Sequence, residues 1–134
     1  MVKNGAMNAE ANVFFDHEKA DRVRYRHKRA GHLQSKGRFM AAQILAMIQD
    51  GLWLDNARKA NAAAAALAGS VPDRLLHPVE ANEIFLHLTG PERAALRAQG
   101  FGFHDWGFEG ARFVTAWDTR DDHARALASA IAAL

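Results

Sequence analysis

The chain has 134 residues, of which 49% are hydrophobic and 24% charged, and these values fit one modest domain or a small domain with an appendage. It contains no cysteine, which excludes disulfide bonds and thiolate chemistry, and its formal charge of +2 is nearly balanced. The sequence shows no apolar leader and no apolar run of membrane-spanning length, so we expect a soluble, cytoplasmic protein.

The first part of the chain is predicted to contain a turn, a strand and a helix. The Asn-Gly pair after Lys3 is typical of a tight turn. Residues 11–15, Ala-Asn-Val-Phe-Phe, form a short, bounded segment that predicts a buried strand. Asp16 is placed to cap a helix over residues 17–30, and Gly31 is a suitable residue to end it.

Two helical tracts follow this first helix. Between residues 39 and 48 Gln43 is the only polar residue, so we expect this helix to be buried on all sides. After Asp50 and Gly51 a longer tract places Trp53, Ala57, Ala60, Ala64 and Leu67 on one stripe at helical spacing. The small alanines of this stripe predict close packing against a neighbouring element.

A polar turn with a proline at residues 70–73 predicts a boundary between domains 1–70 and 71–134. Beyond it we expect a helix from Gly90 to Gly100 and a C-terminal helix, at whose start Thr119 and Asp122 resemble a capping box. Strands are predicted at residues 75–78, 83–88, 101–106 and 111–117. The second half is therefore predicted to be an α+β unit, an antiparallel sheet with helices on one face, which folds by itself from about residue 71.

A basic cluster lies within the first predicted helix and has two interpretations. Its members are Arg22, Arg24, Arg26, Lys28 and Arg29. Clustered cations bind nucleic-acid phosphates, but the residues also follow helical spacing, as on an ordinary solvated or interface face. The second interpretation is favoured, because Tyr25 is the only aromatic residue among them.

Two residues could carry chemistry. The seven histidines match no metal-ligand spacing, and nucleotide-binding fingerprints are absent. Lys3 lies in the predicted turn; its amine is either an exposed, inert charge or a Schiff-base nucleophile with a lowered pKa. Arg112 lies in a predicted strand and needs an anionic partner, which is either a ligand carboxylate or a structural acid such as Glu80, Glu83 or Asp118.

Short motifs from Lys3 to the end of the chain form a series. In order they are Lys3-Asn4-Gly5-Ala6, Val13-Phe14-Phe15-Asp16, Lys28-Arg29-Ala30-Gly31, Arg38-Phe39 with Gln43, Leu52-Trp53-Leu54, Asn56-Ala57-Arg58, His77-Pro78-Val79-Glu80-Ala81-Asn82-Glu83-Ile84-Phe85 and Arg112-Phe113-Val114-Thr115. In this order and spacing, the sequence resembles the low-specificity L-threonine aldolases.

The resemblance implies an α/β protein of fold type I that depends on pyridoxal 5′-phosphate (PLP). It implies that Lys3 forms the Schiff base with PLP, that Arg112 holds the substrate carboxylate, and that Arg38 lies near the cofactor or substrate. The implied reaction is retro-aldol cleavage of a β-hydroxy amino acid, L-threonine or L-allo-threonine, to glycine and acetaldehyde.

The resemblance covers only the C-terminal portion of such an enzyme. It identifies residues 1–70 as a remnant of the large PLP domain and residues 71–134 as the small domain. Because the phosphate-binding loop and the aspartate that faces the pyridine nitrogen lie outside the match, we expect this chain to be inactive alone. It would be a truncated frame, a fragment or half of a split gene, and would need a homo-oligomer or a complementing N-terminal half. The alternative is a non-enzymatic interaction or nucleic-acid-binding module that uses residues 22–29.

Overall fold

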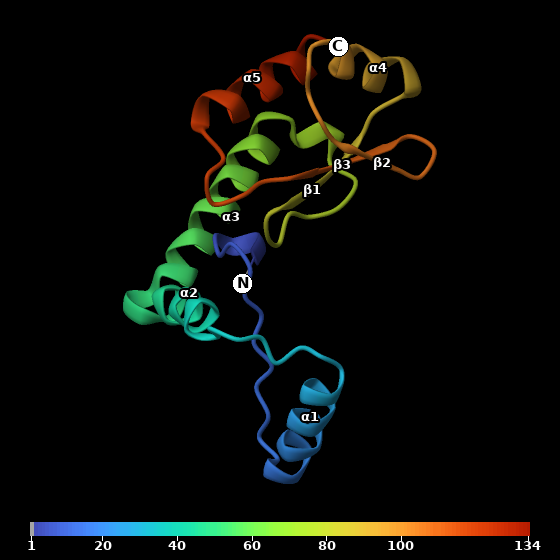
Figure 1. Ribbon diagram of the computed structural model, residues 1–134. Coiled ribbons are helices and arrows are strands. Elements are labelled where there is room, and N and C mark those ends of the chain that lie inside the picture. Colours follow the sequence, from blue (N-terminus) through green and yellow to red (C-terminus); the bar gives the residue numbers. More distant parts are fainter. Residues whose placement is uncertain (1) are drawn as a thin grey trace. The chain divides into compact units, whose positions relative to one another are not determined.

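The computed structural model describes residues 2–134, which divide into two compact units, one up to Trp53 and the other Leu54–Leu134. The predicted domain boundary at residues 70 and 71 remains a prediction; the division between the compact units falls earlier in the sequence, between Trp53 and Leu54. The elements are η1 (Val2–Asn4), α1 (His17–Arg29), α2 (Arg38–Ile48), η2 (Gln49–Gly51), α3 (Leu52–Ser70), η3 (Pro72–Arg74), β1 (Glu83–His87), α4 (Gly90–Ala98), β2 (His104–Trp106), β3 (Gly110–Val114) and α5 (Asp121–Ala132) (Figure 1).

The second unit is built on a small antiparallel sheet in the order β1-β3-β2. Its register pairs Ile84 with Phe113 and Leu86 with Ala111, so these four residues share one face. That face forms the core together with residues of α3, α4 and α5 (Figure 1). The prediction of an antiparallel sheet with helices on one face is thereby confirmed.

The C-terminal half of α3 belongs to this core. Ala64 is completely buried and Leu67 is 2% exposed, as the predicted alanine stripe required. The stripe does not extend to Trp53, which is 45% exposed. The hydroxyl of Thr115 donates a hydrogen bond of 2.7 Å to the carbonyl of Ala60, which joins the end of β3 directly to the helix backbone.

The helices α4 and α5 begin differently. In α4 the predicted start is confirmed: the Thr89 backbone N–H donates to the Glu92 carboxylate at 2.7 Å. The predicted capping box at α5 is wrong. The Thr119 hydroxyl accepts from the Ala116 N–H at 2.8 Å, and Asp122 pairs with Arg120, the residue at the N-cap position.

The predicted strands at residues 75–78 and 101–106 are shorter in the structure. Leu75 forms an isolated bridge with Leu86, and the remainder of that segment is irregular. The second predicted strand is reduced to β2, His104–Trp106. Leu75 lies at the free edge of β1, and β2 pairs with β3 only over residues 104–106.

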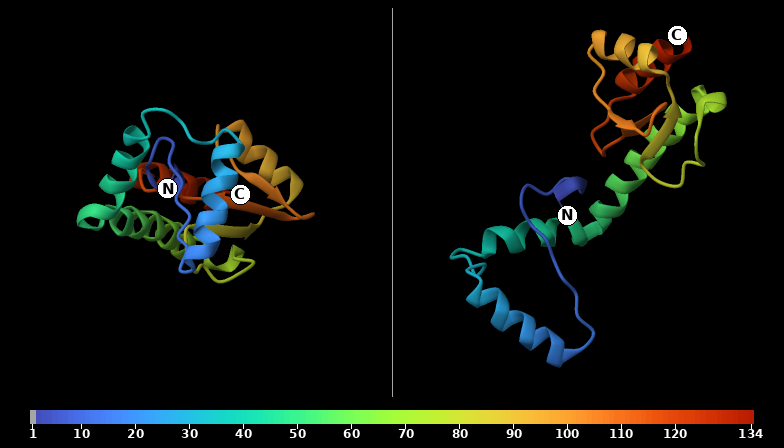
Figure 2. Two further views of the ribbon diagram at one scale, coloured as in Figure 1. Left: turned by 60° about the horizontal axis from the view of Figure 1, so that its bottom comes forward. Right: turned by 90° about the vertical axis from the view of Figure 1, so that its right-hand side faces the viewer.

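In the first unit, α1 begins as predicted. Asp16 accepts hydrogen bonds from the N–H groups of Glu18 and Lys19, and Gly31 follows the helix with φ of 78°. The predicted buried strand at residues 11–15 is wrong. This segment runs as an irregular extended chain between η1 and α1 (Figure 2), and Phe15 is 99% exposed. A strand needs a paired neighbour, and no described residue pairs with this segment.

The prediction that α2 is buried on all sides is also wrong for the described residues. Met47 is buried, whereas Phe39 and Leu45 are 60% and 56% exposed. The helix itself forms as predicted, because its pattern needs only local hydrogen bonds. Much of its apolar surface is not covered by residues 2–134, so this sequence forms the helix without burying it.

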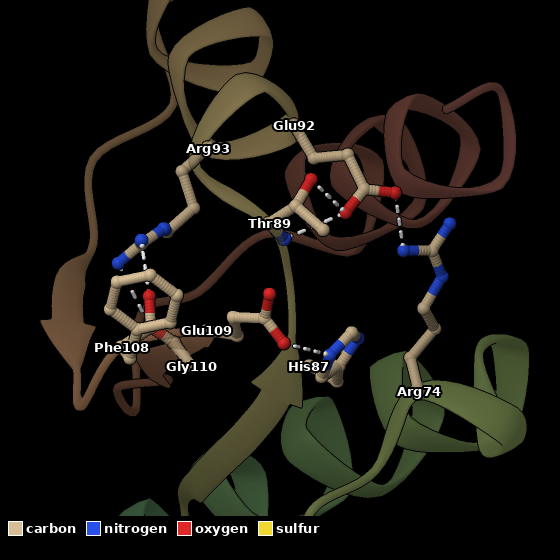
Figure 3. A network of polar contacts seen from close by, with 8 residues as sticks. All are labelled: Arg74, His87, Thr89, Glu92, Arg93, Phe108, Glu109 and Gly110. Atoms are coloured by element: carbon tan, nitrogen blue, oxygen red, sulfur yellow. Dashed lines mark hydrogen bonds and ion pairs between the residues drawn. The ribbon is translucent and has the colours of Figure 1, made fainter.

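A network of polar contacts joins α4 to the segments around it (Figure 3). Arg74 donates to the Glu92 carboxylate at 2.7 Å, and both side chains are largely shielded from solvent. These bonds, first from Arg74 and then from the Thr89 backbone, lower the pKa of Glu92 to about 2. Arg93 donates to the carbonyls of Phe108 and Gly110, which fastens α4 to the β2–β3 hairpin.

The sequence alone suggested that residues 71–134 fold by themselves; because the core includes Ala64 and Leu67 of α3, we instead expect the segment 54–134 to fold by itself and the segment 71–134 to fail. Removal of α3 takes Ala64 and Leu67 from the core and exposes the sheet face that they cover. Circular dichroism during urea unfolding should show a cooperative transition for residues 54–134 only. In the full chain, Leu67→Ala should cost about 2–5 kcal/mol, whereas Leu54→Ala on the exposed end of α3 should cost far less. Equal transition midpoints for the two segments would contradict this expectation.

Acid should remove the contribution of Glu92 to stability. Its folded pKa lies below its ordinary value, so the stabilisation is present above about pH 4.5 and is lost as the pH falls through about 2. At neutral pH the free energy of unfolding of the wild type should be about 1–2 kcal/mol higher than that of Glu92→Gln. Partial exposure of the pair to solvent keeps this difference below the value that the pKa shift alone would give. This difference should disappear near pH 2 in urea titrations. Glu109→Gln, at an exposed pair with His87, should change stability by less than about 1 kcal/mol.

Candidate functional site

Lys3 lies on a short helical turn at the start of the first unit. The turn is η1, closed by a hydrogen bond from the Gly5 N–H to the Val2 carbonyl, and Gly5 has φ of 112°, a conformation that favours glycine. The Lys3 side chain is exposed, and within residues 2–134 it makes no ion pair. The predicted turn is therefore present, and it presents a primary amine to solvent.

Side-chain hydrogen bonds hold this turn and the segment after it against the helices of the first unit. The Asn4 amide donates to the Trp53 carbonyl at 2.9 Å. The Gln43 side-chain oxygen accepts from the N–H groups of Met7 and Asn8 at 2.9 and 3.0 Å. Gln43 was visible in the sequence as the single polar residue between residues 39 and 48, but its role as a hydrogen-bond acceptor for the segment after Lys3 was not predicted.

Arg38 is the first residue of α2 and also belongs to the first unit. Its guanidinium carbon lies 4.9 Å from the centre of the Phe39 ring, a cation–π arrangement at an exposed position. Gln43 lies on the same helix, so Arg38 is carried by the element that anchors the segment after Lys3. The predicted proximity of Arg38 to a cofactor or substrate remains a prediction.

Arg112 belongs to the second unit, at the middle of β3. Its side chain is 28% exposed and forms a hydrogen-bonded ion pair with Glu83 of β1. This pair raises the pKa of the Arg112 guanidinium above its ordinary value, mainly through the hydrogen bond to Glu83. Of the three acidic residues that the sequence suggested as structural partners, Glu83 is the one that pairs with Arg112.

Arg112 lies on the sheet face that the helices leave open. Its cross-strand neighbours are Phe85 on β1 and His104 on β2. The Phe85 ring makes edge-on contacts with Trp106, at 4.9 Å between ring centres, and with His77, at 5.6 Å. The arginine is thus flanked by aromatic groups that the sequence analysis did not single out.

The basic helix α1 is exposed along almost its whole length. Arg22 pairs with Glu18 at 2.5 Å and Arg24 with Asp21 at 3.4 Å, so two of its cations have carboxylate partners on the same helix. Exposed pairs of this kind are typical of a solvated helix surface. If the helix does bind nucleic acid, the candidate contacts are therefore Arg26, Lys28 and Arg29.

The described part of the chain contains no group of three or more histidine and acidic side chains that is placed to hold a metal ion. None of the helices formed by residues 2–134 combines the length and apolar character needed to cross a membrane.

Comparison with known proteins supports the resemblance. No family model matches the chain. The chain is 42% identical over 138 aligned positions to the low specificity L-threonine aldolase of Pseudomonas sp. (strain NCIMB 10558), covering 99% of this chain and 40% of that protein. It is 45% identical over 132 positions to the protein of the same name from Pseudomonas aeruginosa, covering 95% of this chain and 38% of that protein.

The solved structure of Leishmania major threonine aldolase has the same fold over part of its length. The TM-score is 0.74 at 22% sequence identity, and the match covers 82% of this chain and 34% of that chain. The protein is therefore of the α/β class and has the architecture of a portion of a fold type I protein.

More narrowly, the chain is related to the low-specificity L-threonine aldolases over nearly its whole length. It spans about 40% of the length of these relatives, which fits the C-terminal portion.

The hairpin that carries Arg112 depends on a glycine. A Cβ atom at Gly110 would lie 2.1 Å from the Trp106 carbonyl oxygen, whereas a Cβ at Gly102 would meet nothing within 4 Å. We expect Gly110→Ala to lower the midpoint of thermal unfolding clearly and to disturb the Arg112 environment in NMR spectra. Gly102→Ala should be neutral or stabilise by less than about 1 kcal/mol. A Gly110→Ala protein as stable as Gly102→Ala would show that the close approach is not required.

Proposed function

We propose that this chain supplies the cofactor lysine and the carboxylate-binding arginine of a PLP-dependent carbon–carbon lyase. The reaction is cleavage of L-threonine or L-allo-threonine to glycine and acetaldehyde. The observation that carries the proposal is the 42–45% identity to low specificity L-threonine aldolases across 95–99% of the chain. The exposed amine of Lys3 and the position of Arg112 support it.

Lys3 fits the requirement of an aldehyde cofactor. Such a cofactor needs an accessible primary amine on a backbone that holds its position. The amine is exposed, and the turn is held by Asn4, while Gln43 holds the residues that follow it. PLP, when bound, supplies an electron sink for the pair of electrons released at Cα. Lys3 would hold the cofactor through its side-chain nitrogen.

Arg112 would bind the carboxylate of the amino acid and fix the direction of the Cα–Cβ bond. Charge-assisted bonds from a planar guanidinium suit a carboxylate. In the cleavage, the β-hydroxyl loses its proton to a base, the Cα–Cβ bond breaks, and the β-carbon becomes the aldehyde carbon. The electron pair left on Cα takes a proton to give glycine. Arg38 would contribute a further positive charge near the cofactor or substrate.

Exposed apolar side chains support the proposal that the active assembly contains more polypeptide than this chain. In the first unit Val13, Phe15, Phe39 and Leu45 are between 56% and 99% exposed. We propose that a homo-oligomer, or a polypeptide equivalent to the remaining part of the relatives, covers these groups. We expect residues 1–134 alone to be inactive, and a cysteine-free chain of this kind fits a cytoplasmic location.

A fusion protein tests this function. The chain should replace its counterpart in the Pseudomonas aeruginosa relative, to which it is 45% identical. The fusion should show a PLP Schiff-base absorbance band and release acetaldehyde from L-threonine, and Lys3→Ala should lose both. Arg112→Lys should raise KM about 10- to 100-fold, the cost of weakening a charge-assisted bond.

The control for this experiment is Lys59→Ala, which changes an exposed lysine of α3 and should leave both signals intact. The isolated 134-residue chain should show no stoichiometric band that depends on Lys3. A band or a cleavage rate that survives Lys3→Ala in the fusion would overturn the assignment of Lys3. Salt-sensitive binding to DNA or RNA, lost when Arg26 and Arg29 are neutralised, would favour the nucleic-acid alternative instead.

A further inference from the structure

The ion pair of Arg112 and Glu83 runs diagonally across β1 and β3. Arg112 is directly opposite Phe85, and Glu83 is directly opposite Val114, so the two charged residues are offset by one row on the same face. The pair joins the Arg112 Nη2 atom to the Glu83 Oε1 atom. Both side chains keep contact with solvent, at 28% exposure for Arg112 and 42% for Glu83.

The backbone that carries this pair is held firmly. Asn82, next to Glu83, donates its side-chain amide to the Thr115 carbonyl at 2.7 Å and accepts the Thr115 N–H at 3.0 Å. The Thr115 hydroxyl in turn donates to the Ala60 carbonyl on α3. The start of β1 and the end of β3 are therefore fixed to each other and to the helix. Glu83 meets Arg112 because the register brings them together.

The remaining donors of Arg112 are available to a second acceptor. A guanidinium has several N–H groups arranged as a planar fork, and the Glu83 contact engages its Nη2 atom. The row that contains Arg112 lies on the open face, where Val114 is 50% exposed and Trp106 is 50% exposed. The Arg112 side chain is itself 28% exposed, so a small carboxylate from solvent would approach the guanidinium from this face.

We propose that Glu83 is an internal carboxylate that occupies Arg112 and lowers the affinity of this site for carboxylate ligands. The inference rests on the proposed function, in which Arg112 binds the carboxylate of an amino acid. An arriving carboxylate must either share the guanidinium with Glu83, against the repulsion of two like charges, or displace it. Glu83 thereby sets how tightly the site holds an amino acid and how readily it lets the product leave.

Removal of the Glu83 charge should therefore strengthen carboxylate binding. A partly exposed pair of this kind is worth a modest free energy, so Glu83→Gln should bind acetate roughly two- to five-fold more tightly than the wild type. An increase in affinity distinguishes this role from a structural one, because a structural lesion at the sheet would weaken binding. Glu83→Ala should show the same direction of change.

Acetate titration of the full 134-residue chain, followed by the Nε–Hε NMR signal of Arg112, measures this effect. The signal is assigned by its loss in Arg112→Lys. Glu109→Gln is the matched control, since Glu109 is an acidic residue of the same unit that pairs with His87 at 3.1 Å instead of with Arg112. Its acetate affinity should equal that of the wild type.

The proposal is overturned if Glu83→Gln and Glu83→Ala bind acetate no more tightly than the wild type, or if acetate shifts the Arg112 signal in none of these proteins. An equal gain in Glu109→Gln would also overturn it, because the effect would then be a general one of net charge. The titration needs no PLP. Its failure is therefore distinguishable from failure of the proposed function, which the Lys3-dependent cleavage by the fusion protein reports separately.

Discussion

The contact between α3 and the sheet is the constraint on which the second unit depends. Ala64 has no exposed surface, and the neighbouring carbonyl of Ala60 accepts the Thr115 hydroxyl at 2.7 Å. Such a bond needs the helix backbone close to the end of β3, which a larger side chain on this stripe would prevent. Thr115 then holds Asn82, and these residues determine where β1 starts. The positions of Glu83 and Arg112 follow from a helix that contains neither of them.

The first unit is held by different forces. Its polar groups find partners inside the unit, since Gln43 accepts two backbone N–H groups and Asn4 donates to Trp53. Several of its large apolar groups do not, since Phe15 and Phe39 are 99% and 60% exposed. Hydrogen bonds give the unit a defined path but contribute little net stability, whereas burial of apolar surface supplies most of the stability of a fold. Among the described residues, the first unit therefore owes its form more to hydrogen bonds, and the second more to a buried apolar core.

The sequence predicted those elements whose cause is local. The Asp16 cap and the helix from Gly90 depend on neighbouring residues, and both are present in the structure. The strand at residues 11–15 and the burial of α2 required tertiary contacts, which the described residues do not make there, and these predictions failed. The same holds for the candidate site. The turn at Lys3 could be predicted from its own residues, but the partner of Arg112 could be identified only from the register of β1 and β3.

Two interpretations of Arg112 were open at the level of sequence, a structural ion pair and a ligand-binding cation, and the structure makes them compatible. A partly buried guanidinium with no counter-ion would be costly, so Glu83 stabilises the folded chain whether or not a ligand is present. The same contact leaves other donors of the guanidinium open to the exposed sheet face. If Arg112 is to stay charged without a ligand and still bind a carboxylate, it needs a permanent acidic partner that holds it only weakly. A carboxylate one row away on the adjacent strand, partly exposed to water, has the charge and the position for that task.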